Sequence, residues 1–336
     1  MNTSPTPELT QFAEDVLSGL SSTPKRLSSK YFYDDEGSRL FREIMRLPEY
    51  YPTRAELGIF QNQAHSILDA FLGSGPNTTT NARSAIRDPQ LLDLIELGAG
   101  DGTKTAVLIE HFLKKDIDFT YSPIDISQEA NDALLARFRE KFPDLRINPH
   151  TGDYFTVLGT LRNGSNRRKI LMFLGSNIGN FSRNQAVDFF RQLRGVMNLN
   201  DRAFIGFDMQ KDPRVIVRAY DDPTGVTAAF NLNLLSRING ELGADFDLEK
   251  FSHYAQYRPV ECAARSFLIS REKQTVTIEA LNQSFDFDQW EPIFMEISQK
   301  YTRTMIEELA AESDFEIETE FCDDINFYTD SLWKPV

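Results

Sequence analysis

Apolar residues recur at two different periods along the chain. Near the amino terminus they recur every third or fourth residue, which predicts helices over 7–20, 37–45 and 53–72. From residue 91 onward, short apolar runs alternate with helical segments of about ten to fifteen residues. This alternation is typical of a parallel sheet with helices on both faces. The apolar runs predict strands over 91–98, 119–127, 145–154, 168–176 and 202–210.

The alternation stops after residue 212. A helix is predicted over 226–238, and strand-like runs follow at 253–261, 264–271 and 274–281. Their close spacing and a tight turn before the last run favour an antiparallel meander, inserted into the α/β unit.

The last segment returns to the first pattern. A helix over 301–313 and strands over 315–322 and 326–333 would complete the parallel sheet. We therefore predict an α/β fold with a second, α+β domain. The sheet domain comprises 55–210 and 301–336, and the second domain comprises 1–54 and 211–300.

Composition and charge argue against several classes of binding partner. The net charge of −14 makes nucleic acid a poor partner, and the longest purely apolar run, 170–174, is far too short to span a membrane. The first thirty residues contain no apolar secretory segment. Two cysteines and four scattered histidines do not have the spacing of a metal site. We expect a cytoplasmic protein that is a monomer and holds no metal.

The strongest local motif reads ELGAGDGTKT, from Glu96 to Thr105. Its glycines permit a sharp turn and a close approach of the backbone to a ligand, and the following helix offers N–H groups to an anion. In a dinucleotide fingerprint the third glycine would come one residue later. The spacing after Glu96 is instead that of an S-adenosylmethionine (SAM) loop, although a merely tight turn is the alternative. Lys104, one turn into the predicted helix, could pair with the cofactor carboxylate.

Two acidic residues follow at matching positions. Asp125 is expected at the end of the second strand, where an acid can accept hydrogen bonds from ribose hydroxyls. Asp153 follows the third strand and could accept from an adenine amino group, with Tyr154 supplying a backbone donor or a ring face. Either acid alone is more often a solvated loop residue. Together with Gly98 they predict a SAM site at the carboxyl ends of successive strands.

The fourth strand leads into FLGSNIGNF, at 173–181. Asn180 in this run can both donate and accept hydrogen bonds, which suits an amine or a carboxylate. Taken alone, an asparagine after a glycine is usually a turn residue.

At this point the sequence resembles the histidine N-α-methyltransferases of ergothioneine biosynthesis. The likeness covers nearly the whole chain, and PEYYPTRAE and YDDPTGVTAAFN are specific because neither has a general role in a fold. It implies a Rossmann-like SAM-dependent methyltransferase sheet and a second, substrate-binding domain. The implied reaction trimethylates the α-amino group of L-histidine to hercynine, through mono- and dimethyl intermediates, and releases S-adenosylhomocysteine.

The resemblance also implies roles for residues at matching positions. Tyr33 and Asn180 would lie at the reacting amine. The implied cofactor contacts are Gly98, Lys104, Asp125, Asp153 and Tyr154. The implied substrate contacts are Tyr50, Asn180 and Tyr220 for the amino acid portion and Glu296, Ile297 and Ser298 for the imidazole.

One position departs from the family. Where the family often has a methionine lining the imidazole pocket, the matching residue here is Ser266. The departure affects the shape of the pocket, and thus the strictness for histidine. Retention of Glu296 and Ser298 favours a substrate ring with nitrogens that form hydrogen bonds.

Three other functions compete with this interpretation. The first is an N-methyltransferase of another aromatic amino acid, such as tryptophan. The second is an NAD-type oxidoreductase on the same sheet, which the early third glycine disfavours. The third is a non-catalytic SAM-binding or scaffold protein, which the presence of all the implied substrate residues disfavours.

Overall fold

The computed structural model describes residues 7–73, 92–161 and 167–336. The chain forms two compact units, which we describe separately. The large unit comprises Pro52–Gln210 and Lys300–Val336, and the small unit comprises Met1–Tyr51 and Lys211–Gln299. The sequence at 73–84, GSGPNTTTNARS, is rich in glycine, asparagine and threonine and predicts a surface loop, most of which lies outside the described residues.

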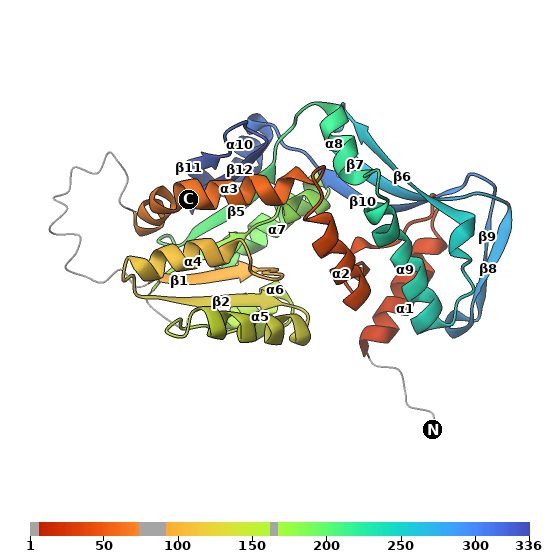
Figure 1. Cartoon of the computed structure of the whole chain (residues 1–336), viewed down its shortest axis with the longest axis horizontal. Coiled ribbons are helices and arrows are strands. Elements are labelled where there is room, and N and C mark those ends of the chain that lie inside the picture. The colour runs from red at the N-terminus through yellow and green to blue at the C-terminus, as the bar shows by residue number, and fades with distance from the viewer. Residues whose placement is uncertain (1–6, 74–91, 162–166) are drawn as a thin grey trace, which may run out of the picture. The chain divides into compact units, whose positions relative to one another are not determined.

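The large unit is built on a sheet with the strand order β11-β12-β5-β4-β1-β2-β3 (Figure 1). The strands from β5 to β3 run parallel, whereas β12 and β11 close one edge in antiparallel pairing. The fold class predicted from the sequence is confirmed. The strands are β1 (Leu92–Leu97), β2 (Phe119–Asp125), β3 (His150–Thr151), β4 (Arg168–Phe173), β5 (Arg202–Asp208), β11 (Phe315–Cys322) and β12 (Tyr328–Pro335).

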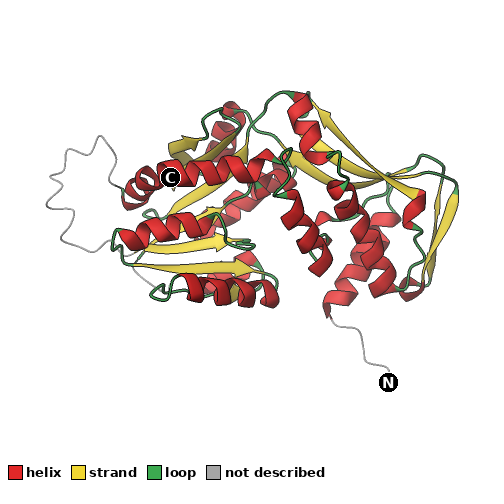
Figure 2. Ribbon diagram, in the orientation of Figure 1, coloured by secondary structure: helices red, strands yellow, loops and turns green. Residues whose placement is uncertain are grey.

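Helices cover both faces of this sheet (Figure 2), which explains why its strands read as nearly continuous apolar runs. On β1, Leu92 and Leu94 join one core with α3, α4 and α5. Ile95 and Leu97 point the other way, into a core with α6, α7 and α10. The helices are α3 (Tyr51–Leu72), α4 (Thr105–Lys114), α5 (Gln128–Lys141), α6 (Tyr154–Leu161), α7 (Arg183–Val196) and α10 (Arg303–Glu312).

The order of the strands reverses beside β1. The chain builds outward through β2 and β3, then returns to place β4 on the other side of β1. Ligands of open α/β sheets bind beyond the carboxyl ends of the strands at such a reversal. A ligand is therefore expected beside the segments that follow β1 and β4.

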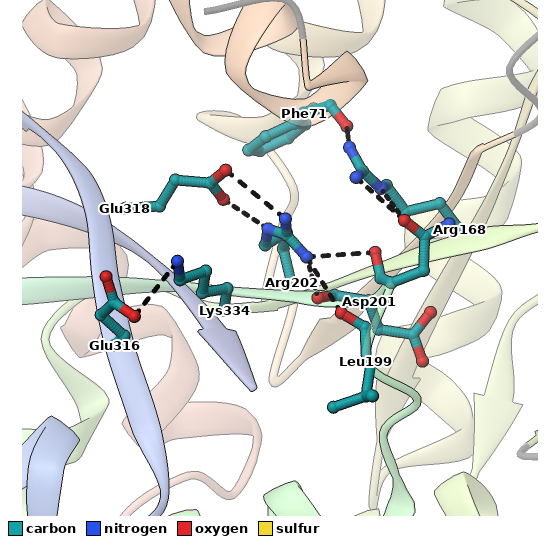
Figure 3. A network of polar contacts seen from close by, with 9 residues as sticks. Phe71, Arg168, Leu199, Asp201, Arg202, Glu316, Glu318 and Lys334 are labelled. Carbon is teal, nitrogen blue, oxygen red and sulfur yellow. Dashed lines mark hydrogen bonds and ion pairs between the residues drawn. The ribbon is translucent and has the colours of Figure 1, made fainter. Parts of the chain in front are cut away.

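The opposite, amino-terminal ends of β4 and β5 are held by arginines (Figure 3). Arg202 reaches across β12 to pair with Glu318 of β11, and it also donates to the Asp201 carbonyl at 2.8 Å. Arg168 donates to the Phe71 carbonyl near the end of α3 at 2.7 Å. These contacts join the last helical turn of α3 and the antiparallel edge strands to the parallel sheet.

The small unit combines helices with two antiparallel strand groups. Its core is formed by apolar residues of α1, α2 and α9 and of the strands, among them Phe12, Phe230 and Phe285. One group has the order β10-β7-β6, and the other is the hairpin β8-β9. The elements are α1 (Pro7–Leu20), α2 (Asp35–Ile44), α8 (Pro213–Tyr220), α9 (Val226–Leu242), β6 (Phe251–Arg258), β7 (Ala263–Ser270), β8 (Gln274–Ile278), β9 (Gln283–Phe287) and β10 (Pro292–Gln299).

The predicted meander is wrong in its third strand. β6 and β7 pair as expected, but β7 takes β10 as its second partner and β8 pairs with β9. The backbone of Ser270, at the end of β7, bonds to Trp290 and Glu291 and so leaves no place for β8. β10 was missed because its register shifts between Phe294 and Glu296, which breaks the alternation.

Other differences are local. The third parallel strand is only His150–Thr151, much shorter than the predicted 145–154. Lys104 does not lie one turn into its helix but occupies the position immediately before α4. Helices α6 and α8 were not predicted, because each has only eight residues.

Candidate functional site

The turn after β1 requires glycine. Gly98, Gly100 and Gly102 all have positive φ, at 70°, 56° and 63°, in the region that favours glycine. A Cβ atom at Gly98 would lie 2.7 Å from the Tyr154 hydroxyl, and one at Gly102 would lie 2.8 Å from the Phe138 ring. Beside Gly100 the space is open, with no atom of the described residues within 4 Å of an added Cβ. The turn is therefore packed at its two ends and open at its middle.

The two predicted acids lie at the carboxyl ends of neighbouring strands. Asp125 is the last residue of β2, and burial raises its pKa against opposing hydrogen bonds from backbone N–H groups, including that of Ser127. One oxygen of Asp153 accepts from the backbone N–H groups of Phe155 and Thr156, at 3.1 and 3.0 Å, and so caps the start of α6. Asp153 thus has a structural task alongside any contact with a ligand.

Tyr154, the first residue of α6, connects these acids to the glycine turn. Burial, reinforced by the charges of Asp125 and Asp153, raises the pKa of Tyr154 to about 12. Its hydroxyl lies against Gly98, as the distance above shows. The structure thus brings Gly98, Asp125, Asp153 and Tyr154 to one edge of the sheet.

Glu96 is buried at the end of β1. Its two carboxylate oxygens accept from the hydroxyls of Thr105, at 2.8 Å, and Tyr121, at 2.6 Å. Burial raises the pKa of Glu96 to about 7, despite these hydrogen bonds. Because Thr105 is the first residue of α4, Glu96 ties the start of that helix back to the strand that precedes the turn.

The partner of Lys104 is Glu56, a residue that was not predicted from the sequence. The Lys104 ammonium pairs with Glu56 of α3, whose side chain has no exposed surface. Burial alone would lower the pKa of Lys104, but the charge and hydrogen bond of Glu56, together with other nearby carboxylates, outweigh burial and raise it. A signal for Glu56 exists in the sequence, because it lies three and four residues before Ile59 and Phe60, on the apolar face of the predicted helix.

The loop after β4 is fastened at several points. The Gly175 N–H donates to Glu56 at 2.8 Å, and the Ser176 hydroxyl accepts from the Asp208 N–H at 3.0 Å. The Ile178 carbonyl accepts from the Tyr301 hydroxyl at 3.2 Å. Asn180 ends the short helical turn of this loop and is exposed. Asn180 is therefore exposed on a loop that these hydrogen bonds hold at the same edge as the glycine turn.

In the small unit, Tyr220 and Ser298 form a buried pair. The Tyr220 hydroxyl donates to the Ser298 hydroxyl at 2.7 Å, which links α8 to β10. Asp222, two residues later, accepts from the backbone N–H groups of Val226 and Thr227 at the start of α9. These contacts, with the Thr224 hydroxyl, outweigh the effect of burial and lower the pKa of Asp222 to about 2.

Strand register places Ser266 beside Glu296. The two residues are direct partners across β7 and β10, so their side chains lie on the same face. Ser298 lies two residues on from Glu296 and shares that face, whereas the side chain of Ile297 lies on the other. Ile297 can therefore reach a ligand beside Glu296 only through its backbone.

The predicted tyrosines near the amino terminus belong to an aromatic cluster. The Tyr33 ring is half exposed and packs edge-on against Phe41 and Phe230, with ring centroids 5.4 and 5.7 Å apart. Tyr50 joins the cluster through Phe41, with ring centroids 6.1 Å apart. The structure thus brings Tyr33 and Tyr50 together around one phenylalanine.

A family model described as a histidine-specific, SAM-dependent methyltransferase matches residues 12–335. The chain belongs to this family. It is 37% identical over 287 residues to the histidine N-alpha-methyltransferase of Mycobacterium tuberculosis, covering 85% of this chain and 83% of that protein. The corresponding protein of Mycolicibacterium smegmatis is 35% identical, with 88% and 86% covered. Ergothioneine biosynthesis protein 1 of Schizosaccharomyces pombe is 28% identical, over 88% of this chain and 37% of that protein.

This methyltransferase uses SAM, and the residues at the sheet edge fit that cofactor. The open middle of the glycine turn, the Lys104 ammonium and the acid that ends β2 offer a backbone surface, a cation and a ribose acceptor. Within the described residues there is no cluster of side chains suited to a metal ion, and no helix long and apolar enough to cross a membrane.

Proposed function

We propose that this methyltransferase transfers three methyl groups in succession to the α-amino nitrogen of L-histidine, giving hercynine for ergothioneine synthesis. The observation that carries the proposal is the family match over 12–335, which spans segments of both units. Bound SAM supplies a methyl group carried on a sulfonium. The large unit binds this cofactor and the small unit recognises the amino acid.

The cofactor contacts follow the edge of the sheet. Gly98 lets the backbone approach the cofactor, and Lys104 pairs with its carboxylate. Asp125 accepts from the ribose hydroxyls. Asp153 keeps one oxygen for the cap of α6 and accepts from adenine with the other, beside Tyr154.

The substrate contacts divide by chemical type. Tyr50 and Tyr220 bind the amino acid portion, and Glu296 accepts from an imidazole N–H while Ser298 bonds the other ring nitrogen. Ser266, opposite Glu296, adds a hydroxyl to that face. A tryptophan pocket is not favoured, because indole has one ring N–H and no second ring nitrogen for Ser298 to bond.

The amine must lose its proton before it reacts. An ammonium beside the sulfonium would be repelled by about 4 kcal/mol at ~4 Å in an intermediate dielectric. We assign Asn180 and Tyr33 to hold the neutral amine, so that its lone pair faces the methyl carbon and its proton passes to water. No strong base is needed for this step, and correct placement contributes about 7–11 kcal/mol.

Mass spectrometry of the purified enzyme with SAM and histidine tests the reaction. The expected product carries three added methyl groups, and equal turnover of tryptophan in a competition assay would contradict the specificity. A monomer acting in the cytoplasm remains our prediction, and sedimentation equilibrium checks the first part.

Two variants test the assignment of the units. Glu296→Ala should greatly weaken histidine binding and leave SAM binding nearly intact. Asp125→Ala should do the reverse. Unchanged histidine turnover in the first variant would remove Glu296 from the pocket, and an unaltered SAM titration in the second would refute the ribose contact.

A further inference from the structure

Glu56 contacts the segments that follow both β1 and β4, although nothing in the expected reaction calls for it. We propose that Glu56 is a positioning residue for the cofactor, which holds the Lys104 ammonium in place to receive the carboxylate of SAM. The inference rests on the proposed role of Lys104 and adds the residue through which that role is achieved.

The carboxylate of Glu56 is divided between separate segments. Its Oε2 accepts from Lys104, which follows the glycine turn of β1. Its Oε1 accepts from the Gly175 N–H after β4 and from the Tyr328 hydroxyl of β12, both at 2.8 Å. One side chain from α3 therefore fixes the segments on both sides of the strand reversal, where a cofactor of this fold binds.

The location of Lys104 is correspondingly restricted. A Cβ atom added to Gly175 would lie 3.3 Å from the lysine Nζ, so the ammonium lies directly against the backbone of that loop. The Lys104 side chain keeps 21% of its surface exposed, whereas Glu56 has none. Lys104 is therefore held at Glu56 while part of its side chain remains exposed. It has three N–H donors, so pairing with Glu56 leaves others for a ligand.

A second carboxyl, that of Asp330, lies close to Glu56. Asp330 is fully buried nearby, and the described residues offer its oxygens no donor, only the neighbouring carboxyl of Glu56. Burial and the negative charge of Glu56 raise the pKa of Asp330 well above its usual range, which favours its protonated form. A protonated Asp330 adds no second negative charge beside the Glu56–Lys104 pair.

A competing effect of Glu56 would change the affinity for the cofactor in the opposite direction. Glu56 also neutralises part of the charge that Lys104 could offer, so its removal could strengthen the binding of an anionic cofactor. Positioning predicts the reverse, because an unanchored lysine must lose rotamer freedom on binding. In Glu56→Gln, moreover, an amide N–H group would face the ammonium instead of an acceptor. Measured affinities decide between the two.

The experiment compares two ligands in calorimetric titrations of the intact protein. S-adenosylhomocysteine has the amino acid carboxylate, whereas 5′-methylthioadenosine keeps the nucleoside and sulfur but lacks it. For Glu56→Gln we expect S-adenosylhomocysteine to bind about tenfold more weakly, with 5′-methylthioadenosine within about twofold of wild type. Tyr328→Phe is the matched control, because it removes one neutral contact to Glu56 and should leave the ratio of the two affinities unchanged.

The ratio of the affinities for the two ligands distinguishes the ways in which the inference could be wrong. Equal weakening of both ligands in Glu56→Gln would show a merely structural role, and tighter S-adenosylhomocysteine binding would show that charge competition dominates; either result overturns the inference. Lys104→Met tests the underlying assignment, and an unchanged ratio there would refute the lysine contact itself. Should Glu56→Gln not fold, Glu56→Asp retains the charge but is too short to span both segments, and it should show the same selective loss.

Discussion

Glu56 and Asp208, two buried carboxylates of the large unit, pair with lysines, whereas the predicted substrate residues of the small unit depend on neutral hydrogen bonds and strand register. Glu56 pairs with Lys104, and Asp208 pairs with Lys300 at 2.7 Å with both side chains almost fully buried. In the small unit the corresponding link is the Tyr220–Ser298 hydroxyl pair. The two units therefore differ in how much free energy a substitution is expected to cost.

The physical reason is desolvation. Removing one partner of a buried ion pair leaves a charge that neither water nor protein compensates, whereas removing one hydroxyl leaves a neutral group. We therefore expect substitutions in the large unit to change stability and its pH dependence. Substitutions in the small unit should mainly change recognition of the amino acid.

The largest effect is expected from Lys300→Met. It leaves Asp208 buried without its cation and should reduce the free energy of unfolding by about 3–5 kcal/mol, measured by urea denaturation. Adding Asp208→Asn to this variant removes the charge and should recover much of the loss. A loss below about 1 kcal/mol in the single variant would contradict the contrast between the units.

The next effect concerns pH. Because the pKa of Glu96 is raised to about 7 in the folded protein, its contribution favours the fold fully below about pH 4.5 and is lost as the pH rises through 7. Relative to Glu96→Gln, the wild type should lose up to about 3 kcal/mol between pH 5 and pH 8. Urea denaturation across this range measures it. Glu140→Gln, at an exposed position of α5, should show no such difference.

A smaller loss is expected from Asp222→Ala in the small unit. The variant leaves the first N–H groups of α9 without their acceptor and should cost about 1–2 kcal/mol at neutral pH. Because the pKa of Asp222 is lowered to about 2, its contribution is present above about pH 4 and is lost as the pH falls toward 2. Asp221→Ala, at the exposed neighbouring position, is the control and should cost little in thermal denaturation.

The smallest effect on stability is expected from Tyr220→Phe. It removes one neutral hydrogen bond and should cost about 0.5–1.5 kcal/mol in denaturation experiments, while the KM for histidine rises and SAM binding stays constant. A double-mutant cycle with Ser298→Ala isolates the coupling between the hydroxyls. A cost larger than that of Lys300→Met would reverse the comparison.

The sequence was most informative where local pattern and fold follow the same rule. A buried strand of a parallel sheet needs apolar residues on both faces, so β1, β2, β4 and β5 could be predicted from continuous runs. The glycine turn after β1 could also be predicted, because positive φ at Gly98 restricts the residue type locally. The location of Asp125 could be predicted as well, because this acid comes at the end of a strand that the apolar run already indicates.

Contacts between distant segments could not be derived in this way. The partner of β7 is β10 rather than β8, a choice made by backbone hydrogen bonds that no local pattern records. The link from Glu56 to Lys104 joins residues 48 positions apart, and the one from Glu56 to Tyr328 joins residues 272 apart.

The sequence by itself determined the parallel sheet, the glycine turn and, through the resemblance, the methyltransferase family, because each depends on residue type at fixed local spacing. Only the tertiary structure decided which charges meet and which strands pair in the small unit. A buried carboxylate is stabilised by whichever cation the fold brings close to it. The local sequence of α3 does not indicate that Lys104 is the cation that pairs with Glu56.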